Sequence, residues 1–551
     1  MFHADLATVR HYHRLSKHLP ERYAPGPGQL DWATQPDPFR RFAGCRLIPL
    51  PFARHGGARY QQLYQPTTPP AMLDRATLGA LLELGLGLSA WKEWEGNRWS
   101  LRNHPSSGNL HPTEGYVVLL QPIDTELVPG VYHYAPCEHA LECRATLGPD
   151  GQAALWGLFP HTPALLGLSS IHWREAWKYG ERAFRYCQLD TGHAAAALAF
   201  AGRVAGWPVH LVAGASDNAI AALCGLDRER DFHMAEQEHP DLLLALTPDC
   251  HHLPARCDVT QVRKALGDAA WHGQANPLST SHVSWHALEQ VVDSTSGAQG
   301  WPVAHSTASC QASPSVGTND PDAVMAIRLR RSAAGMDGSS PMSQAAFRQL
   351  LARLMPSPAA PWIALPFDPA ISLLLFVHHV EGMSPGLYLL PRAAGHAEAL
   401  RQAMDSPHLH WHPVSDAPLS LICLSQDTDW RDAARMLNCQ QDIAADGAFA
   451  VAMLADFDHA LQQGAPNYRR LFWECGLLGQ ILHLEAEAAG LAGTGIGCFY
   501  DDLLHRIIGL DVDAEQWQSL YHFTIGGREE DRRLRTIPAY AHLDREQEAS
   551  S

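Results

Sequence analysis

The stretch Phe184-Arg-Tyr-Cys-Gln-Leu-Asp-Thr-Gly192 recurs in diverged form as Tyr468-Arg-Arg-Leu-Phe-Trp-Glu-Cys-Gly476. The second copy starts 284 positions after the first (468 against 184). The same offset relates Gly206 to Gly490, Gly225 to Gly509 and Asp227 to Asp511. A second pair of similar segments, 256 positions apart, is Pro129-Gly-Val-Tyr132 and Pro385-Gly-Leu-Tyr388. Because a register kept over about 40 residues rarely arises by chance, the sequence predicts two halves with one fold.

The length of 551 residues also favours two domains, since single hydrophobic cores stop growing at about 250–300 residues. The segment from His272 to Asp320 is rich in Ser, Thr, Gly, Pro and Ala. Such a composition is typical of a linker, and one short helix is expected within it near Trp285–Val292. We therefore predict a first domain over residues 1–270, a linker over 271–320 and a second domain over 321–551.

Each repeat centres on a long helix, expected over Arg182–Ala205 and over Tyr468–Ala489. Small residues crowd both helices and would let them approach closely, packing the halves together; an alanine-rich core helix explains the same composition. Further helices are expected over Asp74–Leu86 and Ser343–Met355, and strands over Tyr116–Leu120, Leu242–Leu246, Ser372–Val377, Leu419–Leu424 and Tyr521–Ile525. This mixture predicts an α+β fold.

Composition and charge exclude several classes of protein. The formal net charge is −17, with 58 acidic against 41 basic residues, so a nucleic-acid partner is not expected. No apolar run reaches membrane-spanning length, and the N-terminus lacks the basic and apolar regions of a signal peptide, so we expect a cytoplasmic protein with no membrane partner. The 12 cysteines form no Cys-x-x-Cys pair, and we expect them to be small core residues. His408, His410 and His412 would share a strand face, but we expect no metal site there or at the weaker Cys250-His251-His252.

Candidate chemistry begins with the polar segment Arg102-Asn-His-Pro-Ser-Ser-Gly-Asn-Leu-His-Pro-Thr-Glu114, which runs into an apolar strand. A cation, two hydroxyls, an amide and a flexible glycine stand together in it. Such a loop can offer many hydrogen bonds to one flat, polar ligand.

Two segments of the second half add to this loop. Arg330-Arg331-Ser332 suits a phosphate, because guanidinium groups bind oxygens bidentately, although a solvated charge cluster is the commoner explanation of such a run. Gly493-Thr-Gly-Ile-Gly497 follows a helix, which disfavours a dinucleotide fingerprint. Its glycines would let backbone N–H groups approach a ligand, or they would form a helix-terminating turn.

Together these motifs resemble the nitroreductase superfamily. Pro105-Ser-Ser-Gly-Asn-Leu-His-Pro112 is similar to its flavin-contacting loop, Arg330-Arg331-Ser332 to its phosphate segment, and Gly493–Gly497 to its glycine segment beside the flavin ring. More narrowly, Pro129–Tyr132 and the segment from Tyr179 to His193 are similar to the SagB/ThcOx-type branch. That branch includes azoline dehydrogenases of thiazole/oxazole peptide biosynthesis.

The resemblance implies two tandem nitroreductase-like domains, each a mixed sheet flanked by helices, that form an intramolecular pseudo-dimer. It also implies FMN bound where the domains meet. The first half has Ala213-Gly-Ala-Ser216 where the glycine segment is expected, and the second has only Pro356-Ser-Pro-Ala-Ala360 as a flavin loop. We therefore expect one competent flavin site and one decayed site.

The resemblance also assigns roles to individual residues. Arg330, Arg331 and Ser332 are expected to hold the phosphate, helped by Arg102 or Arg528, because Ala334 replaces the usual second arginine of the motif. Pro105, Ser106, Ser107 and Asn109 are expected at the ring's polar edge. Gly493, Gly495, Ile496 and Gly497 are expected beside the ring. Lys178 and Tyr179 are similar to the proton-handling pair of the azoline-dehydrogenase branch, although an ordinary helix-start pair fits as well.

The expected activity is that of an FMN-dependent oxidoreductase that acts on a small molecule or a peptide, with NAD(P)H as a possible electron donor. Two alternatives remain open at this point. One is an enzyme that uses the flavin itself as substrate, and the other is a non-catalytic flavin-binding partner of a peptide-modifying complex. Assembly beyond the fused pair is left undecided.

Overall fold

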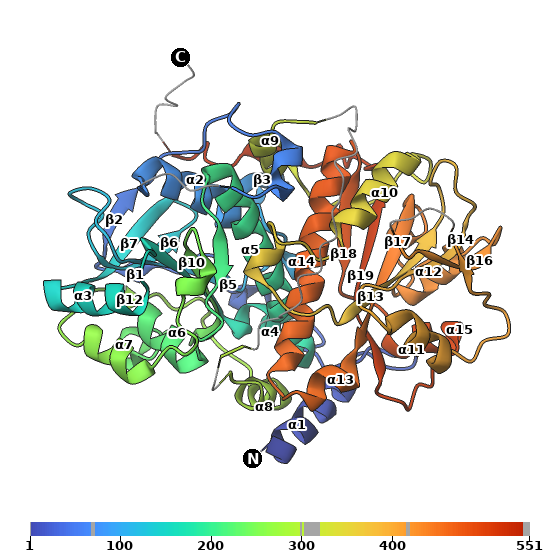
Figure 1. The fold of residues 1–551 in the computed structure, drawn as a ribbon, viewed down its shortest axis with the longest axis horizontal. Helices are drawn as coiled ribbons and strands as arrows, with labels where there is room; N and C mark the ends of the chain where they lie inside the picture. Colours follow the sequence, from blue (N-terminus) through green and yellow to red (C-terminus); the bar gives the residue numbers. More distant parts are fainter. Residues whose placement is uncertain (1, 68–71, 298–299, 302–319, 415–418, 544–551) are drawn as a thin grey trace.

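Two large antiparallel sheets, each flanked by helices, lie on either side of a central helix pair (Figure 1). The computed structural model describes residues 2–67, 72–297, 300–301, 320–414 and 419–543. The first sheet contains β2 (Arg46–Pro49), β5 (Thr113–Leu119), β6 (Gly130–Ala135), β7 (Ala140–Thr146), β8 (Ala164–Ser170), β9 (Val209–Leu211), β10 (His239–Leu246) and β11 (Ala270–Trp271). The second contains β13 (Ile371–Val377), β14 (Gly386–Leu390), β15 (His412–Pro413), β16 (Ile422–Gln426), β17 (Phe449–Asp456), β18 (Ala492–Ile496) and β19 (Trp517–Gly526).

The two sheets repeat one topology. The first has the order β7-β6-β5-β8-β10-β9, and the second has the matching order β16-β14-β13-β17-β19-β18. The predicted α+β class with two like domains is therefore confirmed. One detail was wrong, because the ladders between these strands are antiparallel rather than mixed.

Helices cover both faces of each sheet. The first half contributes α1 (Phe2–Leu15), α2 (Arg75–Leu86), α3 (Pro149–Leu158), α4 (His172–Tyr179), α5 (Ala183–Ala205), α6 (Asp217–Cys224), α7 (Val259–Ala265) and α8 (His286–Ser294). The second contributes α9 (Ala323–Leu329), α10 (Gln344–Arg353), α11 (His396–Ala403), α12 (Arg431–Leu437), α13 (Phe457–Gln462), α14 (Asn467–Ala488) and α15 (Asp501–Ile508). Within the described residues, none of these helices combines the length and the apolar character needed to cross a bilayer.

Strand residues alternate between a shared core and two outer cores, as the two-residue period of a strand requires. In β13, Leu373 and Leu375 face the large core that contains α5 and α14, while Leu374 and Phe376 face the outer core of the second half. β5 divides its side chains in the same way between the shared core and the outer core of the first half. Each sheet is thus buried on both faces, which explains its nearly continuous apolar strands.

The crossing of α5 and α14 forms the seam between the halves, as the small residues of the two helices predicted. A Cβ on Gly192 would collide with the backbone of Trp473, and a Cβ on Gly476 would lie 2.8 Å from the amide nitrogen of His193. These two glycines are equivalent in the repeat. Only residues without a side chain allow the helix backbones to approach this closely.

Two reciprocal ion pairs join the halves beside this crossing. Arg185 on α5 reaches Asp501 of the second half at 2.7 Å, and Arg469 on α14 reaches Asp217 of the first half at 2.6 Å. Both members of each pair differ from their counterparts by 284 positions. Such a self-complementary exchange is what a two-fold symmetric interface requires.

The repeated glycines outside the crossing end helices. Gly206 and Gly490 follow α5 and α14 with φ of 83° and 74°, and Gly225 and Gly509 follow α6 and α15 with φ of 73° and 76°. A left-handed residue after the last helical turn satisfies its free carbonyls at no steric cost only when it is glycine. The repeated glycines therefore mark equivalent helix ends in the two halves.

Both ends of the chain pack on the opposite half. Helix α1 contacts the second half, where Arg14 pairs with Glu515 at 2.8 Å and His13 bonds Gln518 at 3.0 Å. Strand β20 (Arg535–Pro538) instead joins a hairpin of the first half made of β3 (Leu88–Trp94) and β4 (Asn97–Arg102). The halves are thus tied together by more than the central helices.

The described part of the segment predicted as a linker packs against the first half. Its described part contains β12 (Gln274–Ala275), which pairs with β1 (Phe42–Ala43), and helix α8, close to the helix expected near 285–292. Residues 298–299 and 302–319 of the predicted linker lie outside the described residues. The division into domains at 270 and 321 therefore stays a prediction.

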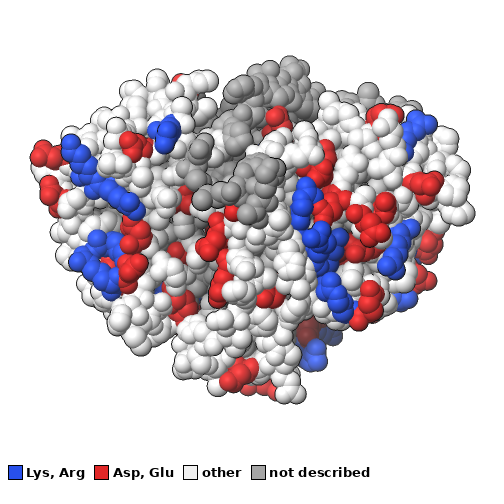
Figure 2. Space-filling model, turned by 90° about the horizontal axis from the view of Figure 1, so that it is seen from below, with Lys and Arg blue, Asp and Glu red and all other residues white. Residues whose placement is uncertain are grey.

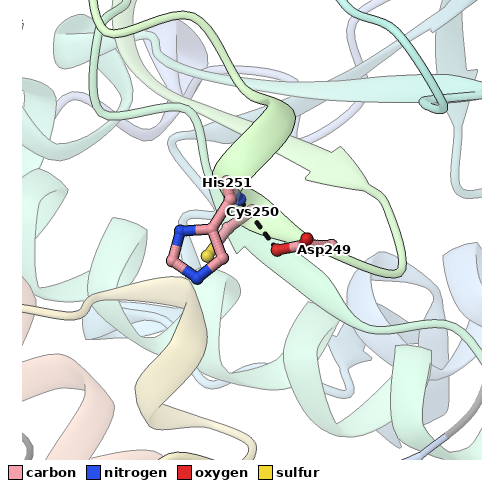
Figure 3. Close-up of side chains that lie close together, drawn as sticks. All are labelled: Asp249, Cys250 and His251. Carbon is pink, nitrogen blue, oxygen red and sulfur yellow. Dashed lines mark hydrogen bonds between the residues drawn. The ribbon is translucent and has the colours of Figure 1, made fainter.

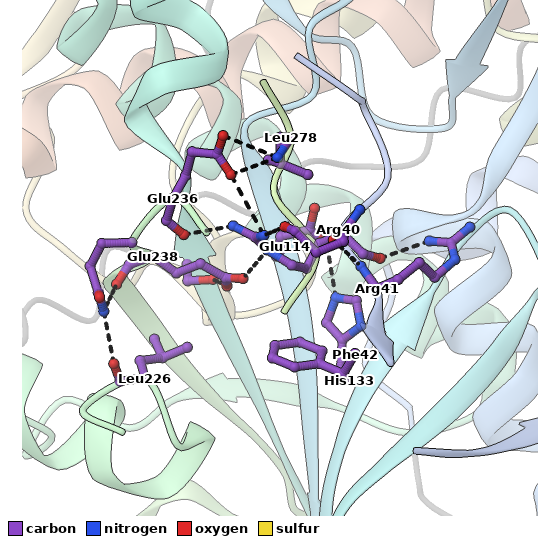
Figure 4. Close-up of polar contacts among 12 residues, drawn as sticks. Arg40, Arg41, Phe42, Glu114, His133, Leu226, Glu236, Glu238 and Leu278 are labelled. Carbon is purple, nitrogen blue, oxygen red and sulfur yellow. Dashed lines mark hydrogen bonds and ion pairs between the residues drawn. The ribbon is translucent and has the colours of Figure 1, made fainter. Parts of the chain in front are cut away.

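A buried polar network fixes the approach to β1 (Figure 4). The Arg40 side chain is fully buried, and it donates to the Glu238 carboxylate at 3.0 Å and to the Glu236 carbonyl at 2.6 Å. The Glu236 carboxylate accepts from the Leu278 amide, so one cluster holds residues 40 and 278 together on the sheet. The network anchors the N-terminal segment that leads toward the site described next.

Candidate functional site

The predicted phosphate-binding arginines lie where the second half meets the β3–β4 hairpin of the first. Arg330 is 3% exposed, and its guanidinium donates to the carbonyl oxygens of Asn103 and Arg102 at 3.1 and 2.8 Å. Arg331 donates to the carbonyl oxygen of Ser89 at 2.6 Å. Backbone of one half therefore positions the cations of the other.

Neither of these two cations forms an ion pair among the described residues, although Glu487 is near enough to raise the pKa of both. Within the described residues, neither Arg330 nor Arg331 has a carboxylate within 4.0 Å, while Arg528 has Glu487 at 3.6 Å. Burial and the neighbouring arginines lower the pKa of Arg330 to about 9 and that of Arg331 to about 10. A lowered arginine pKa means that the charged form is disfavoured, so a bound anion would relieve the cost.

Ser332 and the glycine segment complete this corner. Ser332 forms a parallel bridge with Gly493, and the Thr494 hydroxyl donates to the Ala333 carbonyl oxygen at 2.7 Å. The Arg528 guanidinium donates to the Arg331 carbonyl oxygen at 3.3 Å. The glycine segment is not the helix-terminating turn that the sequence left open, because Gly493 to Ile496 belong to the edge strand β18.

The Pro105–Asn109 loop lies directly on the predicted Lys178–Tyr179 pair. Gly108 has a φ of 60°, and a Cβ there would lie 2.5 Å from the Tyr179 hydroxyl and 3.1 Å from Lys178 Nζ. Only glycine fits both the backbone conformation and the space. The loop glycine thus brings two separately predicted segments into contact.

Tyr186 continues this contact across the seam. The rings of Tyr179 and Tyr186 are 4.5 Å apart, and the Tyr186 hydroxyl donates to the Gly497 carbonyl oxygen at 3.1 Å. Arg182 donates to the same oxygen at 3.1 Å. The first-half loop and the second-half glycine segment therefore meet through Tyr179 and Tyr186.

A third tyrosine lies over the middle glycine. A Cβ on Gly495 would collide with the Tyr521 hydroxyl, which also contacts His193 Nε2 at 3.2 Å. Burial and nearby Asp190 raise the pKa of Tyr521 well above its usual value, so its hydroxyl keeps its proton. Tyr521 is a neighbour of the candidate site that the sequence reading did not single out.

The sequence reading also missed two buried carboxyls beside the loop. Glu175 lies on α4 and Asp190 on α5, with 0% and 2% exposure. Among the described residues, Asp190 accepts from the Ser107 amide at 3.3 Å, and the Ser106 side chain lies beside both carboxyls. Burial raises the pKa of Asp190 to about 8, and burial together with Asp190 raises that of Glu175. A carboxylate three positions before Lys178 on a helix was the available signal.

The other predicted loop residues have mainly internal partners. The Asn109 amide donates to the Ser100 carbonyl oxygen at 2.6 Å, and the Ser106 hydroxyl accepts from the His111 amide at 2.8 Å. Pro105 is half-buried. The Arg102 guanidinium is bound to the carbonyl oxygens of Thr113 and Pro38, whereas Arg330 binds the backbone carbonyl oxygen of Arg102.

The histidine and cysteine clusters do not form part of this site. Asp249, Cys250 and His251 have metal-ligating atoms within 4.8 Å of one another, but Cys250 and His251 are exposed at the surface (Figure 3). Within the described residues, His408, His410 and His412 are not in a group of this kind, and the rings of His410 and His412 are 5.9 Å apart. On the face seen in Figure 2, acidic and basic residues are interspersed.

Part of the second half matches a known family model. Residues 378–527 match the nitroreductase family. The matched segment begins directly after β13 and ends directly after β19, and it includes Gly493 to Gly497. No curated protein sequence matches the chain.

Solved structures extend the likeness to both halves. A nitroreductase-annotated structure from Anabaena variabilis is 22% identical and has a TM-score of 0.62, covering 95% of this chain and 99% of that one. The Escherichia coli microcin synthetase McbBCD complex with truncated pro-MccB17 gives 19% identity, 45% and 94% coverage and a TM-score of 0.26. An FMN complex from Exiguobacterium sibiricum gives 13% identity, 37% and 88% coverage and 0.22. The first of these shows that the whole chain shares one fold with a nitroreductase-type protein.

Proposed function

We propose that this chain is an FMN-dependent oxidoreductase of the SagB-type dehydrogenase kind, with one FMN held between its two halves. The observation that carries the proposal is the pair of Arg330, which is buried, and Arg331, which is half-buried, beside the glycine segment of a nitroreductase match. Among the described residues, neither has a carboxylate within 4.0 Å. An anion with several oxygens, such as the FMN phosphate, suits two guanidinium groups and the Ser332 hydroxyl.

The residues present fit this group at its phosphate end. Arg330 keeps one guanidinium nitrogen, Nη1, buried without a hydrogen-bond partner, which marks a place where an acceptor belongs. Arg331 and Arg528 lie beside it, and Ser332 bridges to Gly493. Bound FMN would supply a two-electron acceptor and donor for hydride. Arg330, Arg331, Ser332 and Arg528 would hold it from the second half, and the Pro105–Asn109 loop from the first.

We assign proton transfer to and from the substrate to groups that keep their protons at neutral pH. Burial raises the pKa of the Tyr179 hydroxyl well above its usual value, and the pKa of about 8 leaves Asp190 largely protonated at pH 7. Each group can therefore donate a proton to a substrate atom and take it back. Lys178 Nζ, held against Gly108, would orient a negative or polar substrate group.

Flavin retention tests the site directly. The purified protein should be yellow and carry one FMN per chain. Arg331→Ala should weaken FMN binding about 10- to 100-fold, because a charged hydrogen bond contributes roughly 1.5–3 kcal/mol. Arg535→Ala is the matched control, since Arg535 is exposed and pairs only weakly with Glu93 at 3.5 Å.

Three results separate the alternatives. Two FMN per chain would contradict a single site, and unchanged FMN affinity of Arg331→Ala would contradict its role. NADH oxidation with a nitro or quinone acceptor would support the oxidoreductase over a non-catalytic partner. Loss of flavin absorbance during turnover would instead identify the flavin as the substrate.

A further inference from the structure

Two cysteines lie together immediately beyond the glycine segment. Cys498 follows Gly497, and Cys439 belongs to the turn after α12. Their sulfur atoms are 2.7 Å apart, whereas sulfurs in a disulfide bond are about 2.05 Å apart. A small movement of either side chain would bring the pair to bonding distance.

The surroundings favour reaction at one of the two sulfurs. The contact with the Cys439 thiol, together with the charge of Arg182, lowers the pKa of Cys498 from its usual value. The same contact, and burial, raise the pKa of Cys439. Cys498 therefore reaches the nucleophilic thiolate form first, and Cys439 stands ready as the resolving thiol.

Access and backbone also support chemistry at this pair. Both cysteines are only partly buried, so a small reagent can reach them. Cys439 has a φ of 53° and Gln440 a φ of 63°, an unusual conformation for residues with side chains, and the Gln441 side chain donates to the Cys498 carbonyl oxygen at 3.0 Å. This turn is held against the Cys498 backbone.

We propose that Cys439 and Cys498 form a site of thiol–disulfide exchange with low-molecular-weight disulfides. The Cys498 thiolate attacks one sulfur of the disulfide, a mixed disulfide forms, and one thiolate leaves and takes up a proton. Cys439 then loses its proton and attacks Cys498, which releases the second thiol. The protein loses two electrons and two protons, and the added disulfide is reduced to two thiols.

A redox titration of the full-length protein tests this site without any flavin or activity measurement. The protein is equilibrated in glutathione buffers of increasing oxidised fraction, quenched with acid, blocked with N-ethylmaleimide and digested for mass spectrometry. Peptides containing Cys439 and Cys498 should become linked as the buffer becomes oxidising, and dithiothreitol should separate them. If both thiols stay alkylated while another cysteine carries glutathione, the proposal is overturned.

Single variants distinguish the roles of the two sulfurs. In Cys439→Ser, one glutathione should accumulate on Cys498, at least tenfold more than on Cys45. Cys45 is a matched control, because it is also partly buried but burial raises its pKa to about 11. In Cys498→Ser, Cys439 should remain alkylated without glutathione. Preferred glutathionylation of Cys439 over Cys498 would overturn the assignment.

Discussion

Asp190 and Glu474 occupy the same position on α5 and α14, yet their surroundings differ. Glu474 accepts from the Ala370 amide at 2.9 Å and forms a buried ion pair with Arg392. Asp190 has no cationic partner among the described residues, and it accepts from the Ser107 amide at 3.3 Å. One carboxyl stabilises its half of the protein, and the other stays available beside the candidate site.

The rest of the helix pair does not share this asymmetry. The ion pairs of Arg185 and Arg469, the crossing glycines and the helix ends are matched between the halves. Tyr132 and Tyr388 are matched too, since their hydroxyls donate to the carbonyls of Val128 and Ser384 at 2.7 and 2.8 Å. Packing is therefore kept in both halves, while the carboxyl at the Asp190 position differs in its partners from the carboxyl at the Glu474 position.

Removing the Arg392 cation, which pairs with Glu474 in the second half, should have the largest effect on the free energy of unfolding. Arg392→Met leaves Glu474 buried without its partner, and we expect a loss of about 3–5 kcal/mol in the free energy of unfolding. Urea denaturation followed by tryptophan fluorescence measures it. Asp190→Asn is the matched control and should be neutral or stabilising, because Asp190 has no cation to lose. Equal losses in both variants would mean that the two positions do not differ as described.

The pH dependence of stability should distinguish the sheets. Burial alone would lower the pKa of His133, but its hydrogen bonds to Glu114 and Glu142 raise it to about 9. The equivalent residue of the second sheet is the buried Leu389. Since an unfolded histidine has a pKa of about 6.5, the contribution of His133, up to about 3 kcal/mol, is fully present below pH 6.5 and is lost as the pH rises through 9.

His133→Gln isolates this contribution from other titrating groups, including Asp190. The difference in unfolding free energy between wild type and variant should shrink from pH 6 to pH 10. A difference that stays constant across this range would show that folding does not raise the pKa of His133.

Adding a methyl group where α5 and α14 cross should lower the free energy of unfolding by a smaller amount. This change should affect both halves at once. Gly476→Ala places a methyl group against the backbone of α5, and we expect a loss of about 1–3 kcal/mol. Gly157→Ala is the control, because α3 has open space at that position and alanine favours a helix by roughly 0.5–1 kcal/mol. Thermal unfolding should move in opposite directions for the two variants, and a stabilised Gly476→Ala protein would disprove the close crossing.

The smallest expected effect concerns the contact between the loop side and the glycine segment. Tyr186→Phe removes the hydrogen bond to the Gly497 carbonyl oxygen and should cost about 0.5–1.5 kcal/mol. Arg182 still reaches the same oxygen, so the segment should keep its place. Hydrogen exchange of the amides from Gly493 to Phe499 should become measurably faster in the variant, and unchanged exchange would count against the contact.

Much of the architecture could be predicted from the sequence, because it rests on periodic features. The long helices were expected over Arg182–Ala205 and Tyr468–Ala489 and are observed over Ala183–Ala205 and Asn467–Ala488. The register of the repeat places Gly192 and Gly476 at equivalent positions, which are the two crossing glycines. The strand expected over Leu419–Leu424 is shifted to Ile422–Gln426, because a short apolar run does not fix where pairing starts.

The site could be predicted only in its segments. Motif types indicated the arginines, the loop and the glycine run, which the structure brings to one seam. The orientation of Arg102 depends on carbonyl groups at Pro38 and Thr113, which no local pattern reveals. Tyr521 was missed because its position beside Gly495 arises from tertiary packing alone, whereas the spacing of Glu175 from Lys178 on α4 was a local signal.

The crossed ends of the chain have a consequence for synthesis. The hairpin β3–β4 is made early, but its partner strand β20 leaves the ribosome only after the second sheet has been translated. Until then one edge of the hairpin exposes unpaired backbone groups, a known route to wrong association between chains. Nascent first halves should therefore depend on chaperones, and slowing translation before residue 535 should lower the yield of native protein.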